Sequence, residues 1–129
     1  MNKFIISGRI TKDLALESTR GGTPVTMLNL AENFSYTDKN GDRQSKTNFF
    51  RITAYGETAK NAVKYCGKGS TVLVEARIEN DNYEKDGKTV YKDNIIAIKI
   101  EYSALKAPGS NGTVEQEADF QYDPETLVE

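Results

Sequence analysis

One nine-residue segment, residues 47–55, alternates between two kinds of side chain. Successive side chains of a strand point to opposite faces, so its even-numbered positions from residue 50 onward would form an apolar face. The odd-numbered face would carry Phe49, Arg51 and Tyr55. Two rings beside a cation suit unpaired nucleic acid, because bases stack on flat rings while a guanidinium holds the phosphates. A second apolar layer or a subunit interface would use the same rings, and the strand alone leaves these alternatives open.

Two more aromatic residues stand beside predicted hairpin turns. Tyr36 precedes a turn that contains Asn40 and Gly41, and Tyr83 precedes a turn that contains Asp86-Gly87. Such dipeptides favour tight hairpins because both of their residues adopt a positive φ readily. Rings on hairpins that flank a binding face could clamp a nucleic-acid strand, although single surface tyrosines are also common in β-rich proteins.

Lysine and arginine side chains provide candidate phosphate contacts. Arg9 and Arg51 are the best placed of them, since both lie within predicted strands. The stretch 67–70 (Gly-Lys-Gly-Ser) resembles a phosphate-binding loop, but it lacks the first glycine of that motif and follows a helix instead of preceding one. The candidates are Lys3, Arg9, Lys12, Arg43, Lys46, Arg51, Lys68 and Arg77.

The composition offers no constellation for catalysis. The chain has no histidine and a single cysteine, Cys66, so it cannot form a histidine-based nucleophile pair, an intrachain disulfide or a cysteine zinc site. The composition leaves a carboxylate-only metal nuclease as an alternative, but the acidic residues are scattered singly and nothing places three of them together. We expect a protein that is not an enzyme and holds no cofactor or metal. The lone thiol, the short apolar run at the N-terminus and the absence of a membrane-spanning stretch predict a cytoplasmic protein.

Five strand regions and one helix would position these side chains. The predicted strands begin at residue 4 and continue at 25–34, 47–55, 70–81 and 90–102. Ala59, Ala62 and Cys66 recur at helical spacing, so residues 57–66 are predicted as a helix, ended by Gly67 in a left-handed cap.

This order of elements predicts the fold class. It is that of an all-β, five-stranded Greek-key barrel of the oligonucleotide-binding (OB) type, with one short helix between the third and fourth strands. Tyr91 and Tyr102 are expected to pack within the last strand.

The charge of the chain is divided unevenly along its length. Residues 1–105 carry a net charge of +3, whereas residues 106–129 carry −5. Residues 107–112 are rich in proline, glycine and small polar residues, which is typical of a linker. We therefore expect a nucleic-acid-binding domain over 1–105, followed by a flexible linker and a disordered acidic tail over 106–129. A solvated tail on a neutral domain would carry the same charges.

Several segments together resemble a known family across about four-fifths of the chain. They are residues 2–13, 28–31, 47–52, 55–56, 65–70 and 74–75. In this order and at this spacing they are similar to bacterial and phage single-stranded DNA-binding proteins of the homotetrameric type. The resemblance implies sequence-independent binding of single-stranded DNA, which protects and organises the strand in replication, recombination and repair. It also implies a homotetramer built partly from pairing of the first strand.

The resemblance places the stacking aromatic residues of the family on Tyr36, Phe49, Tyr55 and Tyr83. The family often has tryptophan at three of these positions, and this chain has no tryptophan. Tyrosine and phenylalanine keep a stacking face of smaller area, so binding is expected to persist.

Three features depart from the family pattern. Leu14 stands where proline is usual, and Glu79 and Asp81 stand where basic residues usually precede the aromatic residue. The family tail ends in a phenylalanine that docks onto replication and repair proteins, whereas this chain ends in Glu129, with Phe120 and Tyr122 as possible substitutes. An OB-type module that binds protein instead of DNA is the main alternative function, and RNA binding is a variant of the first.

Overall fold

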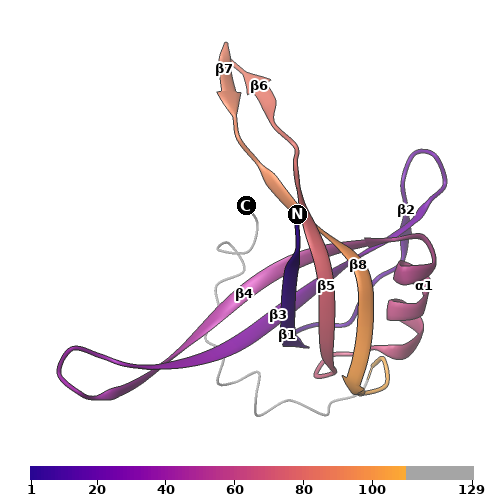
Figure 1. Ribbon diagram of the computed structural model, residues 1–129. Coiled ribbons are helices and arrows are strands. Elements are labelled where there is room, and N and C mark those ends of the chain that lie inside the picture. The colour runs from indigo at the N-terminus through magenta and orange to yellow at the C-terminus, as the bar shows by residue number, and fades with distance from the viewer. Residues whose placement is uncertain (110–129) are drawn as a thin grey trace.

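The computed structural model describes residues 1–109. Five long strands close into a barrel in the order β1-β5-β8-β4-β3, and a β1–β3 pairing completes the ring (Figure 1). The elements are β1 (Phe4–Ile10), β2 (Glu17–Ser18), β3 (Pro24–Thr37), β4 (Arg43–Tyr55), α1 (Gly56–Tyr65), β5 (Thr71–Asn80), β6 (Tyr83–Lys85), β7 (Lys88–Val90) and β8 (Asp93–Ala104). The predicted all-β OB barrel is confirmed, and its helix lies between the third and fourth of the long strands.

Alternation along the strands builds the core of the barrel. Most inward side chains of β3, β4 and β5 within the barrel are buried, and Leu28, Ile52 and Val74 are fully buried examples. The helix α1 adds Ala59 and Ala62, both of which are fully buried. These small residues let the helix approach the strands closely, so that it covers one side of the barrel (Figure 1).

Two glycines are required by close backbone approaches. A Cβ on Gly8 would lie 2.8 Å from the carbonyl oxygen of Ala31, at the point where β1 meets β3. The predicted left-handed cap at Gly67 is wrong: α1 ends at Tyr65, its C-cap residue Cys66 has an extended backbone, and Gly67 does not have a positive φ. Gly67 is needed for another reason, because a Cβ there would collide with the backbone of Ala107.

Two hairpins extend beyond the barrel as separate arms (Figure 1). The first is the outer half of β3 and β4, which stay paired as far as Thr37 and Arg43. The second continues from β5 and β8 into the short β6–β7 hairpin, whose turn holds Asp86 and Gly87 at φ 53° and 77°. Positive φ at both central residues is what an Asp-Gly hairpin turn requires. These arms carry two of the aromatic residues predicted for the site.

The chain beyond β8 lies against the barrel as far as Gly109. The backbone N–H of Lys106 donates to Ser70 Oγ (2.9 Å), and that of Gly67 donates to the carbonyl oxygen of Lys106 (2.8 Å). The N–H of Gly109 donates to Asp13 Oδ2 (3.1 Å). Lys106 and Gly109, the first and fourth residues of the expected linker, are therefore hydrogen-bonded to the barrel. Its remainder and the acidic tail, with Phe120 and Tyr122, lie outside the described residues.

Candidate functional site

The outer wall of β4 presents the residues that the alternation singled out. Ile52 and Ala54 are fully buried in the barrel, so their neighbours must point outward. Tyr55 is 44% exposed, Arg51 is exposed and Phe49 is half-buried. The two rings and the cation therefore share one outer face, and they are not sealed inside the core.

A row of side chains crosses three strands on this face. In the ladder, Phe49 of β4 stands opposite Ala31 of β3, and Ala31 stands opposite Arg9 of β1. Directly opposed residues in antiparallel strands share a face and lie about 4.5–5.5 Å apart at Cβ. Arg51 stands opposite Asn29 in the next row of the same face. We call the outward face that holds Arg9, Phe49, Arg51 and Tyr55 the barrel wall.

Tyr36 lies on the other face of the β3–β4 hairpin. The register of the two strands runs without a shift from Val25–Tyr55 to Thr37–Arg43, so parity is kept along the arm. Tyr36 is even-numbered like the buried Leu30, and it therefore continues the inward face of β3 beyond the end of the barrel. The structure does not bring Tyr36 to the barrel wall.

A second ring accompanies Tyr36 and was missed by the sequence reasoning. Phe34 is 46% exposed and Tyr36 is 42% exposed, and their ring centroids lie 5.7 Å apart with an interplanar angle of 21°. Lys46 stands directly opposite Phe34 in the ladder, on the same face. The predicted strand ended at residue 34, whereas β3 continues to Thr37. A strand extended past Tyr36 would have placed Phe34 and Tyr36, two residues apart, on one face.

Tyr83 lies on the other arm, away from both of these groups (Figure 1). It is exposed on β6, opposite Val90 of β7. The expectation that Tyr91 packs within the last strand is wrong, because Tyr91 precedes β8 and is 80% exposed. Tyr102 does pack against the core, and burial raises the pKa of its hydroxyl.

Acidic side chains at the base of this arm have neighbouring partners. Glu79 pairs with Arg77 at 3.1 Å, and Asp81 accepts a hydrogen bond from the Asn94 amide at 3.3 Å. The positive partner of Glu79 offsets part of the repulsion that this carboxylate would exert on a phosphate backbone.

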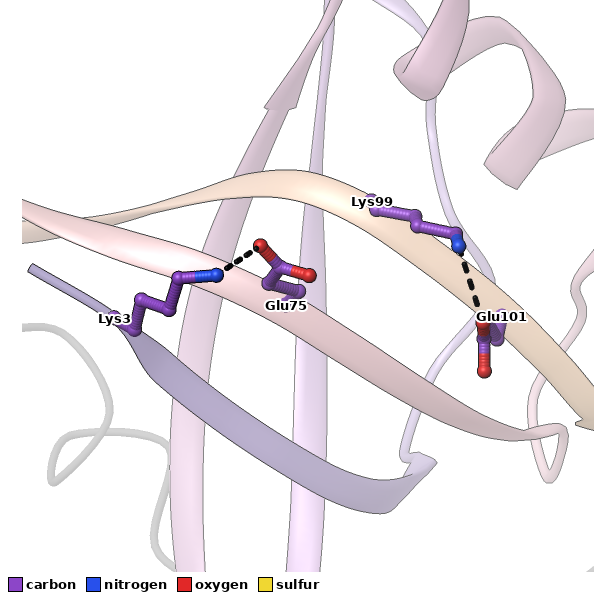
Figure 2. Close-up of polar contacts among 4 residues, drawn as sticks. All are labelled: Lys3, Glu75, Lys99 and Glu101. Carbon is purple, nitrogen blue, oxygen red and sulfur yellow. Dashed lines mark hydrogen bonds and ion pairs between the residues drawn. The ribbon is translucent and has the colours of Figure 1, made fainter.

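The predicted cations are spread over different parts of the molecule. Lys3 pairs with Glu75 at 3.3 Å on the outer face of β1 and β5, beside a second pair, Lys99–Glu101, at 3.2 Å (Figure 2). Lys3 and Arg9 stand near opposite ends of β1, roughly 20 Å apart along the strand. Lys46 belongs to the hairpin arm, whereas Arg9 and Arg51 lie on the barrel wall.

Lys68 lies beside the wall at the end where Arg9 stands. Its backbone N–H donates to Asp13 Oδ1 at 2.8 Å, and the following Gly69 N–H donates to the carbonyl oxygen of Ile10 at 2.7 Å. The loop that carries Lys68 is thus tied to the residue after Arg9. A phosphate chain that reaches Arg9 would pass close to this loop.

The part of the chain that the structure describes contains no group of three or more cysteine, aspartate or glutamate residues that could hold a metal ion. Cys66 is buried, and desolvation raises the pKa of its thiol to about 11, which disfavours the reactive thiolate at neutral pH. No helix within residues 1–109 is long and apolar enough to cross a membrane.

Comparisons with known proteins agree with the fold. The model of the single-strand binding protein family matches residues 1–103. A single-stranded DNA-binding protein of Aquifex aeolicus is 40% identical over 100 residues, which are 78% of this chain and 68% of that protein.

Two solved structures have a similar fold. The wild-type single-stranded DNA binding protein from Thermus aquaticus gives a TM-score of 0.70 at 27% identity, and the match covers 80% of this chain and 50% of that chain. The Plasmodium falciparum SSB complex with ssDNA gives 0.67 at 25% identity, covering 82% of this chain and 96% of that one. The present chain thus spans about half the length of the Thermus aquaticus chain.

Proposed function

Because the chain belongs to the single-strand binding protein family, we propose that it binds single-stranded DNA without regard to sequence. The binding would protect and organise unpaired strands in replication, recombination and repair. The observation that carries the proposal is the barrel wall, where Phe49, Arg51 and Tyr55 point outward from one strand beside Arg9. Stacking of bases on rings and contacts of guanidinium groups with phosphates do not depend on the identity of the base, so a site that uses these two contacts accepts any sequence.

Each group of the wall has a separate task in this proposal. The rings of Tyr55 and Phe49 stack with unpaired bases, at about 1–3 kcal/mol for each base. Arg51, between them on the same face, holds the phosphate backbone, and Arg9 extends this positive track toward the loop of Lys68. Phosphate contacts release counterions, so affinity should fall as salt rises, while the stacking part should remain.

The protein would act by binding alone. The chain has no histidine that could act as a base. Its one cysteine, Cys66, is buried, and burial raises the pKa of its thiol, so it does not offer a nucleophile to DNA. We propose that it uses no cofactor. The unpaired thiol of Cys66 is consistent with a reducing compartment, which supports the cytoplasm as its location.

We propose that the chain assembles as a homotetramer, partly through β1. This strand pairs with β5 from Phe4 to Arg9, whereas its ladder with β3 within residues 1–109 covers only Arg9 and Ile10. One edge of β1 is therefore left for another strand, and Ile5 is exposed beside it. Pairing of the β1 edges of two chains would cover this edge and Ile5 in each chain.

The division of labour along the chain is also part of the proposal. Residues 1–105 would form the DNA-binding domain, and residues 106–129 a linker and acidic tail with a separate task. The net charge of −5 on that tail suits a basic surface on a replication or repair protein, although the terminal phenylalanine of the family is missing.

A tyrosine-fluorescence titration with oligothymidine at low and high salt tests the proposed function. We expect quenching and saturable binding at low salt, with weaker binding at high salt. Replacing Phe49 and Tyr55 by alanine should abolish most binding and leave the solution mass unchanged. If wild type shows no binding at low salt, the proposal is wrong. If the double variant loses assembly but not DNA binding, the wall is a protein interface.

A further inference from the structure

We propose that Met27 is a modification site in the centre of the barrel wall, where oxidation of its thioether by hydrogen peroxide weakens the binding of single-stranded DNA and where bound DNA shields the sulfur. The proposal rests on the proposed function, because it assigns a further residue and a chemical control to the same surface. Met27 lies on β3, next to the strand that carries Phe49, Arg51 and Tyr55.

The register of β3 and β4 places Met27 on the outward face. Its partner in the ladder is Thr53, which stands on β4 midway between Arg51 and Tyr55. Directly opposed residues of antiparallel strands share a face. The following residue, Leu28, is fully buried in the core, so the side chain of Met27 points outward. Met27 therefore belongs to the row between the proposed phosphate contact and the proposed base contact.

Met27 also marks where the outward face of β3 becomes accessible. On the same face, Asn29 is 6% exposed and Ala31 is 4% exposed, whereas Met27 is half-buried. Arg51 and Tyr55 are four residues apart, which is about 13 Å along a strand. A DNA strand that contacts both of them has to cross the row that holds Met27.

The thioether of Met27 reaches across the ladder toward β4. The hydroxyl of Thr53 donates a hydrogen bond to Met27 Sδ at 3.5 Å. This contact holds the sulfur in the row between the Arg51 and Tyr55 positions. An unbranched, polarisable thioether adapts to the shape that lies against it and makes favourable contacts with flat rings. A base that crosses this row therefore gains an apolar contact with Met27.

Oxidation would turn this apolar contact into a polar one. The sulfur lone pair attacks one oxygen of hydrogen peroxide, and an S–O bond forms as the O–O bond breaks. The proton on the transferred oxygen passes to the other oxygen, which leaves as water. The sulfur loses two electrons to the peroxide, and the product is the polar methionine sulfoxide. A base that covers the sulfoxide oxygen must remove its water, which costs free energy.

The other two sulfur atoms of the chain serve as internal references. Met1 is the one other methionine and is fully exposed, so it should oxidise at the rate of a free side chain. Cys66 is buried, and burial raises the pKa of its thiol to about 11, so it offers little thiolate to peroxide at neutral pH. Met27 is thus the sulfur whose oxidation should change the wall.

Peroxide treatment of the full chain tests the proposal. Mass spectrometry of peptides follows the oxidation of Met1 and Met27, and tyrosine fluorescence gives the affinity for oligothymidine before and after treatment at constant salt. Conversion of Met27 to the sulfoxide should weaken binding by about 4- to 15-fold, the factor for the loss of one or two methylene-sized apolar contacts. Saturating oligothymidine during treatment should slow the oxidation of Met27 and leave that of Met1 unchanged.

Met27→Leu is the matched variant, because leucine keeps an apolar side chain of similar volume and has no sulfur. Each protein is compared with its own untreated sample, so the starting affinity of the variant does not enter the comparison. Treatment should leave the affinity of Met27→Leu unchanged, although Met1 and Cys66 are still present. The urea midpoint and the solution mass of the wild type should be the same before and after treatment.

Several results would overturn the proposal while binding by the untreated wild type upholds the proposed function. They are resistance of Met27 to peroxide that converts Met1, unchanged affinity after Met27 is converted, equal oxidation of Met27 with and without oligothymidine, and an equal loss of affinity in Met27→Leu. A lower urea midpoint after treatment would assign the loss to damage of the fold and would also overturn it. Failure of the untreated wild type to bind any oligothymidine would instead reject the proposed function itself.

Discussion

The barrel wall and the hairpin arm are built from the same two strands, yet their side chains are positioned by different forces. On the wall, the direction of each side chain is fixed by a buried neighbour, as Ile52 fixes Arg51 and Ala54 fixes Tyr55. On the arm both faces are open, so Phe34 and Tyr36 are held only by the ladder and by each other. A rigid surface aims its groups at a ligand in advance, whereas an open hairpin can adjust to a strand that passes over it.

The largest effect is expected from removing both rings of the wall. Phe49→Ala combined with Tyr55→Ala should weaken oligothymidine binding by about 2–6 kcal/mol, if each ring provides one stack of about 1–3 kcal/mol. Fluorescence titration of the remaining tyrosines at constant salt measures this loss. The matched pair Phe34→Ala with Tyr36→Ala on the arm should cost less for a short strand. Equal losses from the two pairs would remove the distinction between wall and arm.

A core substitution should separate the two regions by stability. Ile52 is fully buried behind the wall, so Ile52→Ala should lower the free energy of unfolding by about 2–5 kcal/mol. Tyr36→Ala on the exposed arm should change it by only about 0.5 kcal/mol. Urea unfolding followed by circular dichroism gives both values. A large loss of stability from Tyr36→Ala would show that the arm is part of the core.

Arg51 should act mainly through salt dependence. Arg51→Ala removes one phosphate contact, so the slope of log affinity against log salt should decrease in magnitude by about one. Measurements at four salt concentrations with one oligothymidine are sufficient. Lys99→Ala is the control, because Lys99 pairs with Glu101 on the outer face of β8 and should leave the slope unchanged. An unchanged slope for Arg51→Ala would exclude Arg51 from the phosphate path.

The smallest expected effect is a pH-dependent change in the turn at the tip of the β3–β4 hairpin, where Asp38 accepts hydrogen bonds. The N–H of Asp42 hydrogen-bonds the Asp38 carboxylate and holds the pKa of that group below its ordinary value of 3.8, with Gln44 and Asn40 adding to the effect. Because the pKa of Asp38 is lower in the folded chain than in the unfolded chain, its ionised carboxylate stabilises the folded turn at every pH above the pKa of the unfolded chain. This stabilisation is lost as the pH falls through the pKa of the folded chain. Amide shifts of Asn40 and Asp42 should therefore stay constant from neutral pH to about 4 and change only below it.

The control for this titration is the barrel wall, whose amide shifts should not follow the same curve. If the amide shifts of Asn40 and Asp42 change well above pH 4, the hydrogen bonds of Asp38 do not hold the turn. Asp38→Asn should remove the low-pH transition while keeping the hairpin, because an asparagine side chain can accept the same hydrogen bonds without titrating.

The sequence carried enough information for the barrel and for the orientation of Phe49, Arg51 and Tyr55. On β4 the buried side of the barrel requires apolar residues at alternate positions, so the order of apolar and polar residues shows which side chains point outward. The face of Tyr36 was not obtained in this way, because the predicted strand ended at residue 34 and left Tyr36 outside the alternation. Only the register, counted from the barrel to the turn, assigns Tyr36 and Phe34 to the face opposite to Phe49.

Contacts between distant parts of the chain could not be predicted from the sequence either. Gly67 looked like a helix cap, but its lack of a side chain serves the approach of Ala107, which lies forty positions later. The role of Asp13, which accepts hydrogen bonds from Lys68 and Gly109, depends on the same three-dimensional closure. Tyr91 was expected to pack because it was assigned to the last strand, which instead begins at Asp93.

Photo-cross-linking tests the role of the barrel wall most directly. Oligothymidine in which some bases are replaced by 5-bromouracil would be irradiated with the full chain at moderate salt, and the cross-linked residues mapped by mass spectrometry. The wall predicts adducts at Phe49 and Tyr55, with adducts at Phe34 or Tyr36 appearing as the strand is lengthened. Adducts confined to the outer face of β1, β5 and β8, with none on β4, would contradict it.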